Sequence, residues 1–248
     1  MLTEERYATI LRILEEKKAV TVVELTRALH ASESTVRRDL TALHKSGRLY
    51  KVYGGATAID NSYSSAEEDM KTKAGLFNEE KTSIARAAAA LIRPRDFVYI
   101  DAGTTTLRLI DFITEKSANF VTNGLPHASH LAAKGLKVSI LGGELKAVTE
   151  AVMGPEALAS LRLYNFTKGF FGTNGISPGS GFSTPDASEG LIKRTAIGQC
   201  AHAYVLADHS KFNCISPITF ANLSSAAIIT GKLLDRKYLD YTHIIEGE

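Results

Sequence analysis

The sequence predicts an α/β protein in two parts, an N-terminal winged helix-turn-helix domain and a larger C-terminal domain built on a parallel β-sheet. Residues 1–57 show three helical patterns followed by a basic stretch with a period of two. Beyond residue 77, runs of β-forming residues alternate with helical patterns. A chain of 248 residues, 44% of them hydrophobic, is long enough to bury the cores of one small and one medium domain.

The spacing of apolar residues predicts the first two helices. Between Tyr7 and Leu14 apolar residues recur at i, i+3, i+4 and i+7, which indicates an amphipathic helix over residues 3–18. A second periodic stretch begins at Val22 and predicts a short helix that ends near His30. Two helices this close in sequence are typical of the start of a helix-turn-helix.

The third helix contains the sequence STVRRDL, in which two arginines are adjacent. Ser32 is a favourable N-cap and Gly47 is a stop signal, so we expect this helix over residues 32–46. On a helical wheel Val36, Leu40 and Leu43 form one stripe. That stripe is therefore the face expected to be buried.

Opposite this stripe the wheel places hydroxyl groups and cations, namely Ser34, Arg38, Thr41 and Lys45, and no acid. Arg37 lies at the flank of the polar face, and Asp39 lies near the buried edge. A merely solvated face usually mixes acids with bases, so the pattern favours a helix that contacts nucleic acid. Residues 1–57 carry ten Lys and Arg against seven Asp and Glu, a net charge of +3. This excess of positive charge agrees with the same interpretation.

A basic ribbon follows the third helix. RLYKVYGGA alternates in a period of two and ends in Gly54 and Gly55, which predicts two short strands. Three helices followed by such a ribbon is the order of a winged helix-turn-helix domain, here residues 1–57. Residues 58–76 are polar, lack a steady period and are expected to be a linker.

The remaining residues, 77–248, predict a mostly parallel sheet covered by helices on both faces. Helical patterns separate strand-like runs at 97–101, 119–123, 137–143, 168–175, 204–208 and 226–230. Ligands in such sheets bind at the carboxyl ends of the strands. Those ends here combine glycine with polar side chains, as an oxygen-rich ligand requires, in residues 101–106, 122–124, 141–144, 172–175 and 208–211.

The strand end at Gly103–Thr106 is the most specific of these. A glycine followed by three threonines at a strand-to-helix turn offers N–H and hydroxyl donors to an anion, so phosphate is the expected ligand. The alternative is that Thr104 only caps its helix. Glu150, Asp186 and Glu189 are possible general bases, but nothing in the sequence places them near a reacting carbon.

Other chemistry is not supported. The sequence has no P-loop, no dinucleotide fingerprint and no nucleophile elbow. His127 and His130 share the i, i+3 spacing of a helix but lack a carboxylate cluster, so a surface or capping role is favoured over a metal site. Neither a metal nor a cofactor is expected, and Cys200 and Cys214 indicate no disulfide framework. With no signal peptide or membrane-spanning run, we expect a cytoplasmic protein with no membrane partner.

The ordered motifs of this chain resemble those of the DeoR family of bacterial transcriptional regulators over essentially the whole length. The motifs are SESTVRRDLTALHKSGRLYKVYGGA, EEKTSIARAAAALI, IDAGTTT, VTNG, LGGEL, GTNGI and LADHSKF, together with Lys193. The resemblance implies a repressor, not an enzyme, whose C-terminal domain is similar to ribose-5-phosphate isomerase and CoA-transferase folds and senses a phosphorylated sugar. It looks closest to members that control fructose or lactose phosphotransferase-system operons.

The resemblance also implies partners and site residues. The partners are double-stranded operator DNA, a phosphorylated sugar and further copies of the chain in a dimer or tetramer. Arg37 and Arg38 would make the main DNA contacts, although the wing has Tyr53 where the family usually has histidine. The alternative is an isomerase-like enzyme with an accessory helix-turn-helix. The expected DNA-binding residues are Ser34, Thr35, Arg37, Arg38, Thr41, Lys45, Lys51 and Tyr53. The expected ligand-binding residues are Asp101, Gly103, Thr104, Thr105, Thr106, Asn123, Gly142, Gly143, Thr173, Asn174, Gly175, Lys193 and Lys211.

Overall fold

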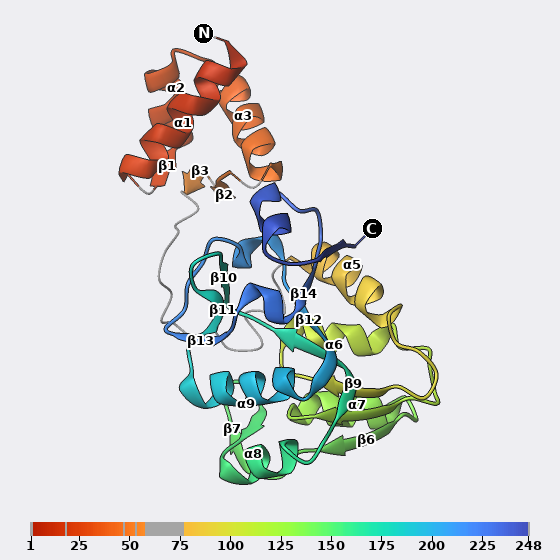
Figure 1. Cartoon of the computed structure of the whole chain (residues 1–248). Coiled ribbons are helices and arrows are strands. Elements are labelled where there is room, and N and C mark those ends of the chain that lie inside the picture. The colour runs from red at the N-terminus through yellow and green to blue at the C-terminus, as the bar shows by residue number, and fades with distance from the viewer. Residues whose placement is uncertain (1, 18, 47, 53, 58–76, 248) are drawn as a thin grey trace. The chain divides into compact units, whose positions relative to one another are not determined.

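The computed structural model of the chain describes residues 2–17, 19–46, 48–52, 54–57 and 77–247. The chain divides into two compact units, Met1–Asn61 and Ser62–Glu248, whose elements are labelled in Figure 1. The expected linker, residues 58–76, lies outside the described residues. No helix in the described ranges is long and apolar enough to cross a membrane.

The N-terminal unit is a three-helix domain with a small sheet, as predicted. Its core is a single apolar cluster to which each helix contributes, for example through Ile10, Leu25 and Leu40. The expected two-stranded ribbon is instead part of a three-stranded antiparallel sheet in the order β1-β3-β2. Its helices are α1 (Thr3–Lys17), α2 (Val22–Leu29) and α3 (Glu33–Lys45), and its strands are β1 (Ala19–Thr21), β2 (Tyr50–Val52) and β3 (Gly55–Thr57).

The extra strand explains one of the two glycines in the ribbon. β1 pairs with β3 so closely that a Cβ on Gly55 would lie 2.2 Å from the carbonyl oxygen of Val20. Only glycine tolerates that approach without a shift of the backbone. Three residues between two helices gave too short a pattern for β1 to be predicted from sequence.

Side chains cap the two helices of the helix-turn-helix. Thr21 and Glu24 form a reciprocal capping box at the start of α2. The hydroxyl of Ser32 accepts from the backbone N–H of Thr35 at the start of α3, as the sequence predicted. Asp39 is buried at 3% exposure, and Arg6 of α1 donates to it over 2.7 Å between Nε and Oδ2. These contacts fix α3 within its own domain.

Replacing Thr21 by alanine should destabilise the N-terminal unit by about 1 kcal/mol, because an N–H at the start of α2 loses its acceptor. Hydrogen exchange of the α2 amides in the full chain measures this change. Thr9→Ala is the matched control, since the Thr9 hydroxyl only donates back to the carbonyl of Glu5 within α1. Equal protection in both variants would contradict the capping role.

The C-terminal unit is built on a seven-stranded, fully parallel sheet in the order β15-β14-β12-β9-β4-β5-β6. Six of these strands coincide with the strand-like runs of the sequence, and the seventh, β15, was not predicted. The strands are β4 (Phe97–Ile100), β5 (Asn119–Thr122), β6 (Lys137–Ile140), β9 (Phe166–Gly172), β12 (Cys200–Leu206), β14 (Ala227–Thr230) and β15 (Ile244–Glu246).

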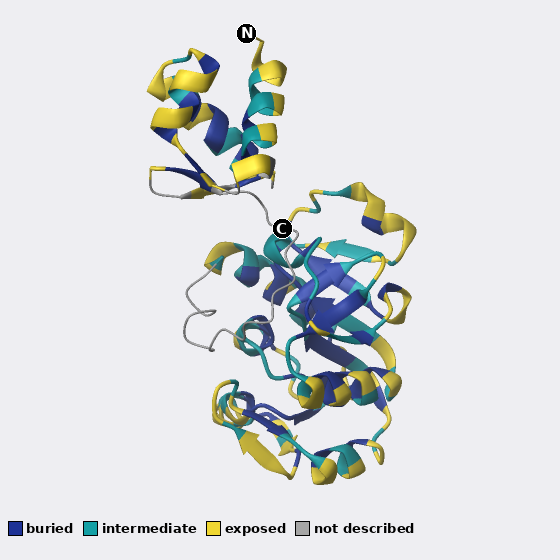
Figure 2. Cartoon of the chain, turned by 90° about the vertical axis from the view of Figure 1, so that its left-hand side faces the viewer, coloured by how far each residue is buried: buried dark blue, intermediate teal, exposed yellow. Residues whose placement is uncertain are grey.

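Helices cover both faces of this sheet, so the sheet separates two apolar cores. On β4, Val98 and Ile100 belong to the core beneath α5, α6 and α7, whereas Tyr99 belongs to the core beneath α8 and α9. Figure 2 shows the central strands as buried and the outer helix surfaces as exposed, while the edge strand β6 is largely exposed. The helices are α5 (Asn78–Ala89), α6 (Thr104–Asp111), α7 (Leu125–Ala133), α8 (Pro155–Leu161) and α9 (Ala187–Gly198).

Two small antiparallel sheets and three 3-10 turns complete the unit, and the sequence predicted none of them. β7 (Glu144–Lys146) and β8 (Ala151–Met153) form a hairpin. β10 (Gly175–Ser177), β11 (Gly181–Thr184) and β13 (Ile218–Ala221) form the second sheet. The turns are η1 (His209–Lys211), η2 (Leu223–Ser225) and η3 (Arg236–Asp240).

The strand order positions the site. From β4 the chain adds β5 and then β6 on one side, and it later returns to place β9 on the other side of β4. Crevices form at the carboxyl ends of parallel strands where the order reverses in this way. The segments that follow β4 and β9 are therefore the expected walls of a ligand site.

Candidate functional site

The exposed face of α3 carries two uncompensated cations. Arg38 and Lys45 are exposed, and neither makes an ion pair or hydrogen bond with another residue in the part of the chain that the structure describes. The stripe of Val36, Leu40 and Leu43 is buried on the opposite side, as the wheel predicted. Long cations held away from the core on a rigid helix suit contacts in the major groove of DNA.

An acid lies at the flank of the polar face of α3. Glu33 is exposed, and its carboxylate lies 3.2 Å from the Arg37 guanidinium. Arg37 is thus partly compensated, whereas Arg38 is not. The wheel places Glu33 about 40° from Arg37 and away from the residues opposite the apolar stripe, so the centre of the polar face is free of acid, as predicted.

The ribbon contacts the same helix face. Lys51 of β2 donates to the Thr41 hydroxyl over 2.7 Å. Ser34 and Thr35 lie beside the N-cap, with their hydroxyl oxygens 2.8 and 2.9 Å from that of Ser32. Lys51 of β2 is thus held against α3 at Thr41, Ser34 and Thr35 lie at the start of the same helix, and Tyr53 lies outside the described residues.

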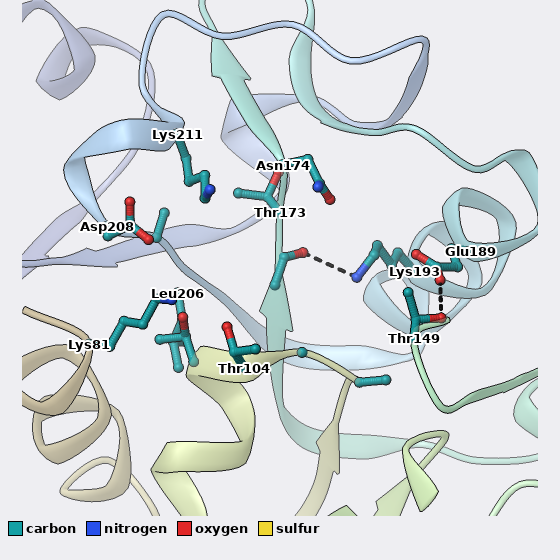
Figure 3. A pocket seen from close by; sticks show the side chains of 15 residues that line it. Lys81, Thr104, Thr149, Thr173, Asn174, Glu189, Lys193, Leu206, Asp208 and Lys211 are labelled. Carbon is teal, nitrogen blue, oxygen red and sulfur yellow. Dashed lines mark hydrogen bonds between the residues drawn. The ribbon is translucent and has the colours of Figure 1, made fainter. Parts of the chain in front are cut away.

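A pocket lies at the carboxyl ends of β4, β9 and β12 in the C-terminal unit (Figure 3). This is the place that the reversal of strand order indicates. Seven of the predicted ligand residues line the pocket, namely Gly103, Thr104, Thr105, Thr173, Asn174, Lys193 and Lys211. Sequence reasoning did not select four further polar residues that also line it, namely Lys81, Thr149, Glu189 and Asp208.

One side of this pocket suits an anion. Gly103 is the N-cap of α6 and has no side-chain cap, so the first N–H groups of that helix face the pocket region. Lys81 of α5 and Lys211 of η1 add two ammonium groups from different elements. Lys81 was not predicted because it lies in a helix far from any strand end, although it is part of the motif EEKTSIARAAAALI.

Two buried side chains support the turn that starts α6. The Thr106 hydroxyl donates to the carbonyl of Asp101 over 2.7 Å, and it lies 3.1 Å from His127 Nε2. For His127 a surface or capping role was expected; the ring is fully buried, which excludes the surface role, and its Nε2 lies 3.1 Å from the carbonyl oxygen of Gly103, the N-cap of α6. His130 lies 3.1 Å from Asp111. Burial lowers the pKa of His127 to about 3, and the ring is neutral at neutral pH.

Asp101 and Lys193 form a buried ion pair at the pocket floor. The Lys193 ammonium donates to Oδ2 of Asp101 and, over 3.2 Å, to the carbonyl of Gly172. Burial raises the pKa of Asp101, although the adjacent Lys193 acts to lower it. Lys193 is 5% exposed, which rules out a solvated helix cation. Its charge is already matched by Asp101.

Several predicted ligand residues stand behind the pocket or beside it. Asn123 accepts from the backbone N–H of Ala102 over 2.9 Å and so braces the turn after β4. Asp101 and Thr106 likewise have hydrogen-bond partners within the protein. Gly142, Gly143 and Gly175 are absent from the pocket wall. A strand-end motif locates the correct edge of the sheet but does not distinguish the side chains that face a ligand from those that support the loop.

One trio in the described ranges has a spacing that could hold a metal ion, namely Glu80, Asp208 and His209. Its groups already have partners. Glu80 accepts from the backbone N–H of His209 over 2.8 Å, and its second oxygen lies 2.6 Å from His209 Nδ1. Asp208 accepts from Ser210. The trio is therefore better described as a link between α5 and η1, which carry the two pocket lysines.

The link between Glu80 and His209 predicts pH-dependent stability. Although burial acts to lower it, the hydrogen bond to Glu80 and the charge of Glu80 raise the pKa of His209. The protonated ring thus stabilises the fold fully below its unfolded pKa of about 6.5, and this contribution is lost as pH rises through the folded-state pKa. Between about pH 6 and 9 the Tm advantage of the native chain over His209→Gln should shrink. A constant Tm difference would contradict this assignment.

Comparisons with known proteins cover both units. The model of the DeoR-like helix-turn-helix domain matches residues 6–62, and that of the DeoR C terminal sensor domain matches residues 77–232. The uncharacterized HTH-type transcriptional regulator FruR of Bacillus subtilis is 44% identical over 93% of this chain and 91% of its own. The lactose phosphotransferase system repressor of Streptococcus mutans is 32% identical over 99% of this chain and all of its own.

Among solved structures, ribose 5-phosphate isomerase A from Methanocaldococcus jannaschii matches 54% of this chain and 54% of its own. Its sequence is 11% identical and its TM-score is 0.41. The full-length sorbitol operon regulator SorC from Klebsiella pneumoniae matches 85% of this chain and 96% of its own, with 12% identity and a TM-score of 0.35. Likenesses at this level say nothing about activity.

Proposed function

This chain belongs to the DeoR family of transcriptional regulators, and from that premise we propose that it represses a sugar-uptake or sugar-catabolism operon in response to a phosphorylated sugar. One observation carries the proposal. The same chain joins a helix-turn-helix with exposed, uncompensated cations to a pocket with two lysines and an open helix N-terminus. The relatives of this chain are named regulators and repressors, and these names do not support the alternative of an isomerase-like enzyme.

We assign a DNA contact to each side chain according to its exposure and its partners within the protein. Arg38 has no competing partner among the described residues and projects from the centre of the exposed face of α3, so it reads base edges. Arg37, held by Glu33, contacts a phosphate at the rim of the groove. Lys45, Lys51 and the hydroxyls of Ser34, Thr35 and Thr41 fix the orientation on the backbone. A dimer or tetramer of the chain would present two or more such helices to operator half-sites.

In the pocket the phosphate of the effector would lie against the start of α6, between Lys81 and Lys211. Its sugar hydroxyls would meet Thr173, Asn174 and Glu189. Binding that favours the DNA-incompetent arrangement shifts the population away from operator. Residues 1–57 would thus form the DNA-binding part, residues 77–248 the sensor, and residues 58–76 the connection between them.

Fluorescence anisotropy with a labelled operator tests this function. The duplex is obtained by in vitro selection with the full chain, and it is titrated at fixed salt because salt alone changes affinity strongly. Fructose 1-phosphate, fructose 6-phosphate and tagatose 6-phosphate are then added separately. At least one should shift the binding midpoint. If none shifts it, the chain does not sense these sugar phosphates as proposed.

A further inference from the structure

We propose that Glu189 is a specificity-determining residue that excludes effectors with a second anionic group. This inference rests on the proposed function and defines the ligand more narrowly. Glu189 lies on α9 and lines the pocket, with its side chain 12% exposed. Its carboxylate accepts from Thr149, at the tip of the β7–β8 hairpin, over 2.6 Å, so Glu189 connects α9 to that hairpin at the pocket wall.

The pocket has two chemically different sides, which Figure 3 shows apart from each other. Lys81, Asp208 and Lys211 lie on one side, near Thr104 at the start of α6. Thr149, Glu189 and Lys193 lie on the other. A ligand that places a phosphate between the lysines must therefore extend its other end towards Glu189.

The charge on the Glu189 side is not balanced. Lys146 is the cation nearest to Glu189, at 3.5 Å, but its ammonium lies closer to Asp186, at 3.0 Å. One cation is thus shared by two carboxylates. Lys193 cannot supply the missing charge, because its ammonium is paired with buried Asp101. Counted over these described residues, this side of the pocket consequently carries a net negative charge, and Glu189 is only partly open to solvent.

A negatively charged surface discriminates between ligands by repelling some of them as well as by binding others. A carboxylate accepts hydrogen bonds from neutral sugar hydroxyls, so a polyol chain is favourable there. A second phosphate would be placed beside Glu189, where partial burial limits screening by salt. Like charges opposed in this way discriminate against the wrong ligand.

Isothermal titration calorimetry on the full chain tests the inference with fructose 1-phosphate, fructose 6-phosphate and fructose 1,6-bisphosphate. The native protein should bind one monophosphate at least about tenfold more tightly than the bisphosphate, which is the preference expected of one opposed charge pair. Glu189→Gln keeps an acceptor for Thr149 and removes the charge, so this preference should fall to about twofold or less.

The control is Glu150→Gln, which removes the same charge from an exposed neighbour that does not line the pocket. It should retain the native preference. The inference is overturned if the native protein binds the bisphosphate as tightly as the monophosphates, or if Glu189→Gln leaves the ratio unchanged. If neither monophosphate nor bisphosphate binds the native chain, the proposed function itself fails and this inference falls with it.

Discussion

Replacing Arg38 by alanine should reduce operator affinity by about 100-fold while the N-terminal unit stays folded. A good side-chain contact to a base edge contributes about 1–3 kcal/mol of discrimination, and a dimer loses two of them. Arg38 is exposed and unpaired among the described residues, so its removal breaks no internal contact. Anisotropy titrations with the selected operator and with an unrelated duplex of equal length measure the effect.

The two duplexes separate base readout from backbone contact. Arg38→Ala should weaken binding to the operator far more than binding to the unrelated duplex. Arg37→Ala should weaken both duplexes similarly and lower the salt slope by about one. Arg12→Ala is the control, because Arg12 is an exposed arginine of α1 that, within the described ranges, pairs only with Glu16. If Arg38→Ala binds the operator with native affinity, α3 is not the recognition helix.

Replacing Lys211 by methionine should move the response to effector to roughly 10- to 150-fold higher concentrations and leave operator binding intact. Lys211 contributes one of the two ammonium groups on the phosphate side of the pocket. Loss of a charge-assisted hydrogen bond of about 1.5–3 kcal/mol corresponds to roughly 10- to 150-fold weaker effector binding. The methionine retains an unbranched side chain, which limits the change in packing.

Anisotropy with native operator measures both properties of Lys211→Met in one titration. The midpoint without sugar phosphate should equal that of the native chain, and the shift on adding sugar phosphate should be absent at the effector concentrations that suffice for the native chain. Lys116→Met serves as the control, since Lys116 is an exposed lysine of the same unit that does not line the pocket. A Lys211→Met protein that responds at native effector concentrations would exclude this pocket side as the phosphate site.

The sequence predicted elements whose patterns are long. The periodic stripe of α3 and its Ser32 cap appear as expected, because a helix of this length shows its buried face repeatedly. Six strands of the parallel sheet were found because each contains a run of β-forming residues between helical patterns, and this holds even for β6, which is largely exposed at the edge of the sheet. β15 and the β7–β8 hairpin escaped prediction because three-residue strands carry too little pattern.

The pocket was predicted in location but only partly in composition. Parallel strands bring their carboxyl ends to one edge, so Gly103, Thr173 and Lys211 could be grouped from sequence alone. Their neighbours Lys81 and Glu189 come from helices, and their places depend on how α5 and α9 pack on the sheet. Tertiary packing likewise decides that Thr106 supports the loop and does not face the ligand. The spacing of residues within one segment therefore does not predict which side chains face the ligand.

In the proposed function, the binding of effector in the pocket and the binding of operator at α3 are coupled within one chain. Thermodynamic linkage then requires that operator weaken effector binding by the same factor by which effector weakens operator binding. The most direct test is calorimetric titration of the best sugar phosphate into the full chain, first alone and then saturated with operator. We expect the effector Kd in the second titration to be higher by the factor found in the anisotropy experiment. Identical Kd values in the two titrations would contradict it.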